Sequence, residues 1–150
     1  MSQHGRGVDL DTSLGYLLKE AASGLRTAME GVLRPLDLNI SQYACLELLA
    51  QRPGLSNSEL ARGAFISRQS MSIVLQSLER EGLVVRPAEP PTGRVLPTEL
   101  TEQGRRRLED ASAKVRAVED RMRRDLDEGD QERLRRLLGA CIASLRSTGR

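Results

Sequence analysis

Apolar residues recur at intervals of three and four along three long stretches of the chain, a spacing that places them on one face of an α-helix. The first stretch predicts a helix from about Thr12 to Arg34, which Pro35 ends because its ring cannot continue an α-helix. The apolar face of this helix is made by Leu14, Leu17, Leu18, Ala21, Leu25, Ala28, Met29, Val32 and Leu33. Its length exceeds what a small globular domain usually needs and is typical of an element that joins subunits.

The other two long stretches lie in the last third of the chain and predict two C-terminal helices. Thr101 is expected to cap the first, Gly129 to end it, and Asp130 to cap the second. Their apolar positions are Leu108, Ala111, Val115, Val118 and Met122 in the first, and Leu134, Leu137, Leu138, Cys141, Ile142 and Leu145 in the second. With the N-terminal helix, these faces predict packing across the two-fold axis of a homodimer, an intrachain helical bundle being the alternative.

Three shorter helices are predicted between these long elements. Ser41 is expected to cap a helix that runs to about Gln51. The sequence Ser56-Asn57-Ser58-Glu59 is a capping-box pattern and predicts a short helix that ends near Gly63. Ser67 is expected to cap a third helix, which runs to about Glu81 and stops at Gly82. The inward positions of this third helix are Met71, Val74, Leu75 and Leu78.

Two short strands are predicted after the 67–81 helix, at Leu83–Arg86 and Val95–Leu100. The intervening PAEPPTG sequence predicts a turn or loop, and Pro97 within the second run marks that strand as an edge. Helix, turn, helix, strand, loop, strand is the order of a winged helix-turn-helix. The chain is therefore predicted to be mainly α with a small two-stranded β-wing.

This order also predicts a division of the chain. Residues 38–101 would form the winged helix-turn-helix, residues 11–37 and 102–150 a helical dimerisation region, and residues 1–10 a disordered N-terminal arm. The second helix of such a module usually enters the DNA major groove. Hydroxyl, amide and guanidinium groups suit base edges and phosphates. The predicted DNA contacts are Ser67, Arg68, Gln69, Ser70, Ser72, Gln76, Arg86 and, at the wing tip, Arg94.

Two segments carry a resemblance to the MarR family of transcriptional regulators, LARGAFISRQSMSIVLQSLEREGLVVRP and GRVLPTELTEQGRRRL. The similar features are Leu60-Ala61, the serine-rich start of the 67–81 helix, Leu78-Glu79 with Gly82-Leu83-Val84 and Arg86, and Leu100-Thr101 with Gly104. The resemblance implies a triangular dimer and a helix-turn-helix that binds DNA.

The chain departs from the family pattern in its wing and its turn. Thr92 and Gly93 stand where many members carry Asp and Arg, which puts the salt bridge that braces the wing in doubt. Phe65 occupies a turn position where glycine is common, and it is expected to pack into the core beneath the turn.

Regulators that resemble this chain commonly bind small anionic or aromatic compounds between the dimerisation helices and the winged-helix lobe. Leu17, Ala21, Tyr43 and Leu46 are the positions expected to line such a crevice, although core packing explains them equally well. Arg105, Arg106 and Arg107 are expected either to touch phosphate or to form a solvated helical face.

Composition narrows the class of protein. The net charge is only +2, so the placement of the basic residues matters more than their sum. No apolar run approaches 18 residues and the N-terminus lacks a signal core, so we expect a cytoplasmic protein without a membrane partner. Cys45 and Cys141 are expected to be buried structural thiols rather than redox sensors.

Neither a catalytic residue constellation nor a metal site is indicated by the sequence. The only histidine is His4, and no phosphate-cradling glycine loop or cysteine–histidine cluster is present. We therefore expect no cofactor, no metal and no enzyme. The predicted function is a homodimeric repressor that a small-molecule effector releases from a palindromic operator. The alternative is a winged-helix protein-interaction module that does not bind DNA.

Overall fold

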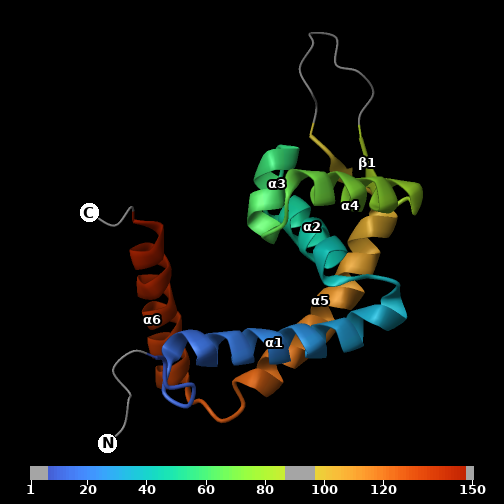
Figure 1. Ribbon diagram of the computed structural model, residues 1–150. Coiled ribbons are helices and arrows are strands. Elements are labelled where there is room, and N and C mark those ends of the chain that lie inside the picture. Colours follow the sequence, from blue (N-terminus) through green and yellow to red (C-terminus); the bar gives the residue numbers. More distant parts are fainter. Residues whose placement is uncertain (1–6, 87–96, 148–150) are drawn as a thin grey trace, which may run out of the picture.

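A computed structural model of the chain describes residues 7–86 and 97–147 (Figure 1). Its elements in order are α1 (Leu14–Leu33), the 3-10 helix η1 (Arg34–Leu36), α2 (Ile40–Gln51), α3 (Asn57–Ala64), α4 (Arg68–Arg80), β1 (Val84–Val85), β2 (Glu99–Leu100), α5 (Glu102–Met122) and α6 (Glu128–Arg146). The strands are antiparallel, with Val84 opposite Leu100 and Val85 opposite Glu99. The prediction of a mainly α fold with a small two-stranded sheet is confirmed.

One aliphatic core joins α2, α3, α4, the sheet and the first half of α5 into a lobe (Figure 1). The chain has only three aromatic residues, so this core consists mainly of leucine, valine, methionine and alanine. Leu33 from α1 and Leu108 and Ala111 from α5 belong to the same core. The core is therefore continuous across the predicted boundaries at residues 37 and 101. The division into a DNA-binding domain and a dimerisation region stays a prediction about function.

Outside the lobe, α1 runs alongside α5, whereas α6 stands beyond their far ends (Figure 1). In the described part of the chain, α6 packs extensively against no other element. Several leucine and isoleucine side chains of α1 and α6 are therefore exposed, namely Leu14, Leu17, Leu18, Leu134, Leu137, Ile142 and Leu145. Within residues 7–86 and 97–147, no helix combines the length and apolar character needed to cross a bilayer.

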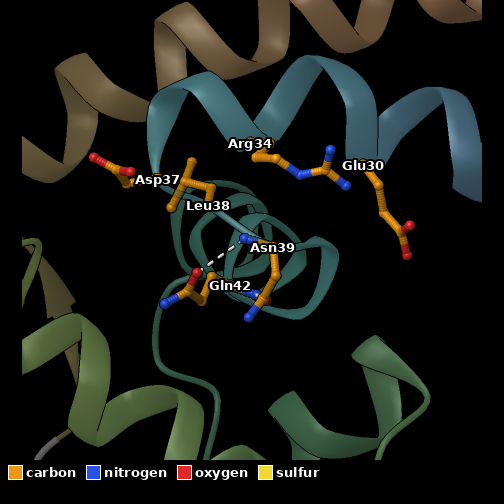
Figure 2. Close-up of a pocket in the computed structure, with 6 residues that line it drawn as sticks. All are labelled: Glu30, Arg34, Asp37, Leu38, Asn39 and Gln42. Atoms are coloured by element: carbon orange, nitrogen blue, oxygen red, sulfur yellow. Dashed lines mark hydrogen bonds between the residues drawn. The ribbon is translucent and has the colours of Figure 1, made fainter.

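The cap of α2 differs from the sequence prediction, because Asn39 rather than Ser41 occupies the N-cap position. The Asn39 side chain accepts a hydrogen bond from the Gln42 backbone N–H at 2.8 Å. In return, the Asn39 backbone N–H donates to Gln42 Oε1 at 2.9 Å (Figure 2). This reciprocal pair is a capping box with Gln at its third helical position, and it leaves Ser41 inside the first turn.

The start of α6 also differs from the prediction. Asp127, not Asp130, is the cap, and its Oδ1 accepts from the Asp130 backbone N–H at 2.7 Å. The preceding helix α5 already ends at Met122, so Gly129 lies inside α6 and ends nothing. By contrast, the predicted cap Thr101 of α5 is confirmed, since its hydroxyl accepts from the Gly104 N–H at 3.0 Å.

The strands are shorter than the sequence predicted. Among residues 7–86 and 97–147, only Val84–Val85 and Glu99–Leu100 pair as strands, so Pro97 precedes β2 instead of lying in it. Residues 87–96, which include the predicted wing tip and Arg94, lie outside the described residues, as does the beginning of the predicted N-terminal arm.

Candidate nucleic-acid interface and effector cavity

The turn between α3 and α4 is built by local hydrogen bonds. The predicted capping box of α3 is confirmed, since Glu59 N–H donates to Ser56 Oγ at 3.2 Å and Ser56 N–H donates to Glu59 Oε1 at 2.9 Å. These bonds from Ser56 hold the pKa of the Glu59 carboxyl below its usual value, with a smaller contribution from the Arg62 charge. At its other end, α3 stops at Phe65, which has φ of 60° and donates its N–H to Ala61 and Arg62 carbonyls.

Phe65 does not pack beneath this turn, contrary to the sequence prediction. Its left-handed backbone leaves the residue 86% exposed. The next residue, Ile66, donates its N–H to the Ala61 carbonyl at 3.0 Å and packs against the core instead. At helix ends with a left-handed residue, the residue that follows it commonly makes the apolar contact with the helix.

The amphipathic character of α4 gives it one buried and one exposed face. Ser67 caps it as predicted, with Oγ accepting from Ser70 N–H at 3.0 Å. All four predicted inward residues, Met71, Val74, Leu75 and Leu78, are buried. A second tie fixes α4 on α2, because buried Gln42 donates from Nε2 to Ser77 Oγ at 3.0 Å. The opposite face of α4 is therefore directed toward solvent.

The predicted DNA-contact residues on α4 fall into two groups. Arg68, Gln69, Ser70 and Gln76 are exposed, and they lie on or beside the outward face. Ser72 is half-buried, and its hydroxyl donates to the Arg68 carbonyl at 3.1 Å. Ser67 is engaged in the cap, and its hydroxyl also donates to Ser70 Oγ at 2.9 Å.

Arg86 lies apart from α4's outward face, at the end of β1. Its Nε lies 3.6 Å from Glu79 Oε2, so the pair ties the start of the wing to the end of α4. Of the three consecutive arginines of α5, Arg107 donates to the Leu36 carbonyl at 2.9 Å and Arg106 pairs with Glu102 at 2.8 Å. Arg107 therefore has a structural role, linking α5 to η1.

Two exposed residues beside the predicted contacts were not identified from the sequence. Ile73 is 62% exposed on the outward face of α4. Arg62 lines a cavity of about 210 Å³ between α3 and α4 together with Ser58 and Arg68. Neither Arg62 nor Arg68 forms an ion pair with an acidic side chain of the described residues. Residues four apart lie on the same face of a helix. The spacing of Ser58 and Arg62 in the sequence could therefore have placed Arg62 on the face of α3 that lines this cavity.

The base of the wing is closed by an unusually close backbone approach. The Thr101 N–H donates to the Leu83 carbonyl at 3.1 Å, and the Thr101 hydroxyl donates to the Gly82 carbonyl at 2.7 Å. A Cβ atom on Gly104 would lie 2.0 Å from the Leu83 carbonyl oxygen. The Leu-Thr-x-x-Gly sequence at residues 100–104 is thereby explained, since only glycine permits this contact.

A cavity of about 600 Å³ lies between α1, the start of α2 and the end of α3. Its lining is mixed, with apolar Met29, Ile40 and Phe65, the hydroxyl of Ser41 and the guanidinium of Arg26. Arg26 pairs with Glu30 at 3.2 Å on the surface. The cavity can therefore accept a compound that combines an apolar body with a negative charge.

The four residues predicted to line an effector crevice do not come together around this or the other described cavities. Leu46 is fully buried in the core, and Leu17 and Ala21 are exposed on α1. The Tyr43 hydroxyl donates to Oε2 of Glu47, one turn further along α2, at 3.3 Å. It also lies 3.5 Å from Ser112 Oγ of α5. Burial raises the pKa of Tyr43, and the Glu47 charge adds to this rise while the Ser112 hydrogen bond opposes it.

Another cavity, at the junction of α1 and α2, is about 410 Å³ and is lined mainly by charged and amide side chains (Figure 2). Glu30 and Arg34 reach it from α1 and η1, while Asn39 and Gln42 contribute from the start of α2. Because Asn39 and Gln42 are already engaged in the capping box, this cavity offers few free groups to a ligand.

The two cysteines differ in their surroundings. Cys45 is fully buried, and burial raises the pKa of its thiol to about 12 although the Arg86 charge lowers it somewhat. Cys141 is exposed on α6, which corrects the expectation that both thiols are buried. The reason is that α6 lacks a covering element within the described chain.

Comparison with known proteins decides the family. The sequence model of the MarR family matches residues 36–95. The HTH-type transcriptional repressor Rv2887 of Mycobacterium tuberculosis is 42% identical over 132 residues, which are 88% of this chain and 95% of Rv2887. The chain belongs to the MarR family.

The structure of this chain is similar to solved structures of Rv2887 bound to two kinds of ligand. The structure of Rv2887 in complex with salicylic acid has a TM-score of 0.73 at 41% identity, covering 87% of this chain and 97% of Rv2887. The structure of Rv2887 in complex with DNA has a TM-score of 0.73 at 39% identity, covering 87% and 98%. These MarR family relatives are transcriptional regulators, so this MarR family chain is a transcriptional regulator and not an enzyme, as predicted.

Proposed function

We propose that this MarR family protein is a homodimeric repressor that binds a palindromic DNA operator through α4 and is released by a small aromatic or anionic effector. One observation carries the DNA part of the proposal. The outward face of α4 presents Arg68, Gln69 and Gln76 to solvent, while four buried side chains and the Gln42–Ser77 hydrogen bond fix its orientation. Its relative Rv2887 has been solved in complex with DNA.

The contacts divide by chemistry. Gln69 and Gln76 carry amides, which pair with adenine edges in the major groove. Arg62 and Arg68 line one cavity and would hold a backbone phosphate, because two guanidinium groups without an acidic partner among the described residues favour an anion. Arg86 and Arg94 remain proposed contacts of the wing, and Ser67, Ser70 and Ser72 of the helix start.

The homodimer is supported by the exposed apolar faces of α1 and α6. Leu134, Leu137 and Ile142 are each close to half exposed in the single chain, and a second copy would cover them. Two α4 helices related by a two-fold axis would read half-sites about 34 Å apart, or one turn of DNA. Residues 11–37 and 102–150 would then form the dimerisation region.

The effector is proposed to enter the 600 Å³ cavity between α1 and the lobe. Arg26 would attract a carboxylate, and Phe65 and Met29 would contact an aromatic ring. Rv2887 has been solved in complex with salicylic acid, a compound with both features. Because the cavity touches α1, α2 and the turn before α4, a bound effector can shift α4 relative to the dimer axis.

The proposal is tested by selecting genomic fragments that the protein retains and then measuring affinity for the shared sequence and for random DNA. Gln69→Ala should weaken operator binding by about 1–3 kcal/mol while leaving random-DNA affinity nearly unchanged. Salicylate should release the operator complex in the same assay. An equal loss on both DNAs would make Gln69 a phosphate contact, and no retained sequence at all would favour the interaction module.

A further inference from the structure

Ile73 is the one large apolar side chain at the centre of the otherwise polar outward face of α4. It follows buried Met71 by two positions, so it lies about 200° around the helix from that core residue. Its side chain is 62% exposed, whereas Met71 is fully buried. Ile73 is therefore directed away from the core.

Folding gives no reason for isoleucine at this position. An exposed β-branched residue forms a helix slightly less well than alanine does, and Ile73 is not part of the hydrophobic core. Gln42, Ser77 and the four buried residues already fix α4 in place. The side chain is thus available for a contact outside this chain.

The neighbours of Ile73 indicate what kind of contact this is. Gln69 precedes it by one turn, Gln76 follows it by one turn and Arg80 by two, and all three are exposed. The one acidic residue of α4, Glu79, is paired with Arg86. A face of amides and cations around one aliphatic side chain complements a polyanion that presents a small apolar group.

We propose that Ile73 reads thymine in each operator half-site by packing against its C5-methyl group. That methyl is the apolar mark of an A·T pair in the major groove. The flanking glutamine amides suit the adenine edge of the same or the next base pair, so the face specifies an A·T step. This inference rests on the proposed DNA-binding function.

The test uses the full-length protein and a library of random synthetic duplexes, from which the bound sequence is selected. Each thymine of that sequence is then replaced by deoxyuridine, which removes only the methyl group, at equivalent positions of both half-sites. At one position, the wild type should lose about four-fold in affinity per half-site, or about fifteen-fold in total, as expected for one buried methyl each.

Two variants separate the methyl contact from general weakening. Ile73→Ala should bind the thymine duplex more weakly than wild type and should no longer distinguish thymine from deoxyuridine at that position. Gln69→Ala, which keeps Ile73, should still distinguish them. Because Ile73 is exposed and alanine favours a helix slightly more, Ile73→Ala should unfold at the same or a slightly higher denaturant concentration than wild type. That result excludes misfolding as the cause.

The inference is overturned if every deoxyuridine substitution affects wild type and Ile73→Ala equally, or if Ile73→Ala binds the selected duplex as tightly as wild type. In both cases selective DNA binding itself would persist. A library from which no sequence is enriched would instead overturn the proposed DNA-binding function, and with it the inference.

Discussion

At Gly104 the absence of a side chain lets the first turn of α5 touch the backbone of Leu83. The contact joins the first turn of α5 to the base of the wing. Thr101 adds two hydrogen bonds to the same stretch of backbone. The sequence marks residues 100–104 as a family-like motif, and the structure supplies its physical reason.

Gly104→Ala should destabilise the protein by about 1–3 kcal/mol or more, because the added methyl would overlap a backbone oxygen that cannot rotate away. The measurement is urea unfolding at equilibrium. Gly31→Ala is the matched control, since a Cβ there meets nothing within 4 Å, and it should stabilise α1 by about 0.5–1 kcal/mol. Equal stability of Gly104→Ala and wild type would contradict the close approach.

Several residue-level predictions were correct because they depend on neighbours in sequence. Ser56, Ser67 and Thr101 cap helices through bonds to residues three positions ahead. Phe65 and Cys141 were predicted wrongly because their burial depends on distant elements. Hydrophobicity alone does not show that Phe65 has a left-handed backbone or that α6 lacks a cover in the single chain.

At the scale of elements, helix starts were ambiguous wherever two capping residues lay close together. Asn39 precedes α2 whereas Ser41 lies in its first turn, and Asp127 precedes α6 whereas Asp130 lies in its first turn. The residue that caps the helix is the one whose side chain reaches the free backbone N–H groups of the first turn. The sequence alone leaves this position uncertain by one or two residues. The periodic apolar positions of α4, in contrast, identified its buried face correctly.

Replacing the cap of α2 should separate the two candidates. Asn39→Ala removes the acceptor of the Gln42 N–H and should lower the free energy of unfolding by about 1 kcal/mol. Ser41→Ala, two residues along in the first turn, should change it by less than about 0.5 kcal/mol. Chemical denaturation of both variants decides between them, and a larger loss for Ser41→Ala would restore Ser41 as the cap.

At the scale of the whole molecule, the single chain leaves its N-terminal and C-terminal helices incompletely covered. α6 extends away from the lobe (Figure 1). Its Leu134, Leu137 and Leu145 side chains are exposed. The sequence predicts these apolar faces, but the relative placement of α1, α5 and α6 depends on contacts between distant segments. In the proposed homodimer, a second copy of the chain would cover the surface that remains.

Leu137→Glu should dissociate the proposed dimer, because it would place a charge in an apolar interface. We expect the dimer dissociation constant to rise at least about 100-fold, measured by sedimentation equilibrium. Ala143→Glu adds the same charge to the opposite face of α6 and should leave association nearly unchanged. A wild type that sediments as a monomer, or a Leu137→Glu variant that stays dimeric, would contradict this arrangement.

The contrast between the two thiols has a practical consequence. The thiolate is the form that reacts with maleimides, and Cys45, with its raised pKa of about 12 and complete burial, offers almost none of it at neutral pH. Cys141 is exposed in the single chain and lies among the apolar residues of α6. The chain thus carries one selective labelling position, Cys141. In the proposed dimer a second copy would cover α6, so modification of Cys141 should slow as the protein concentration rises.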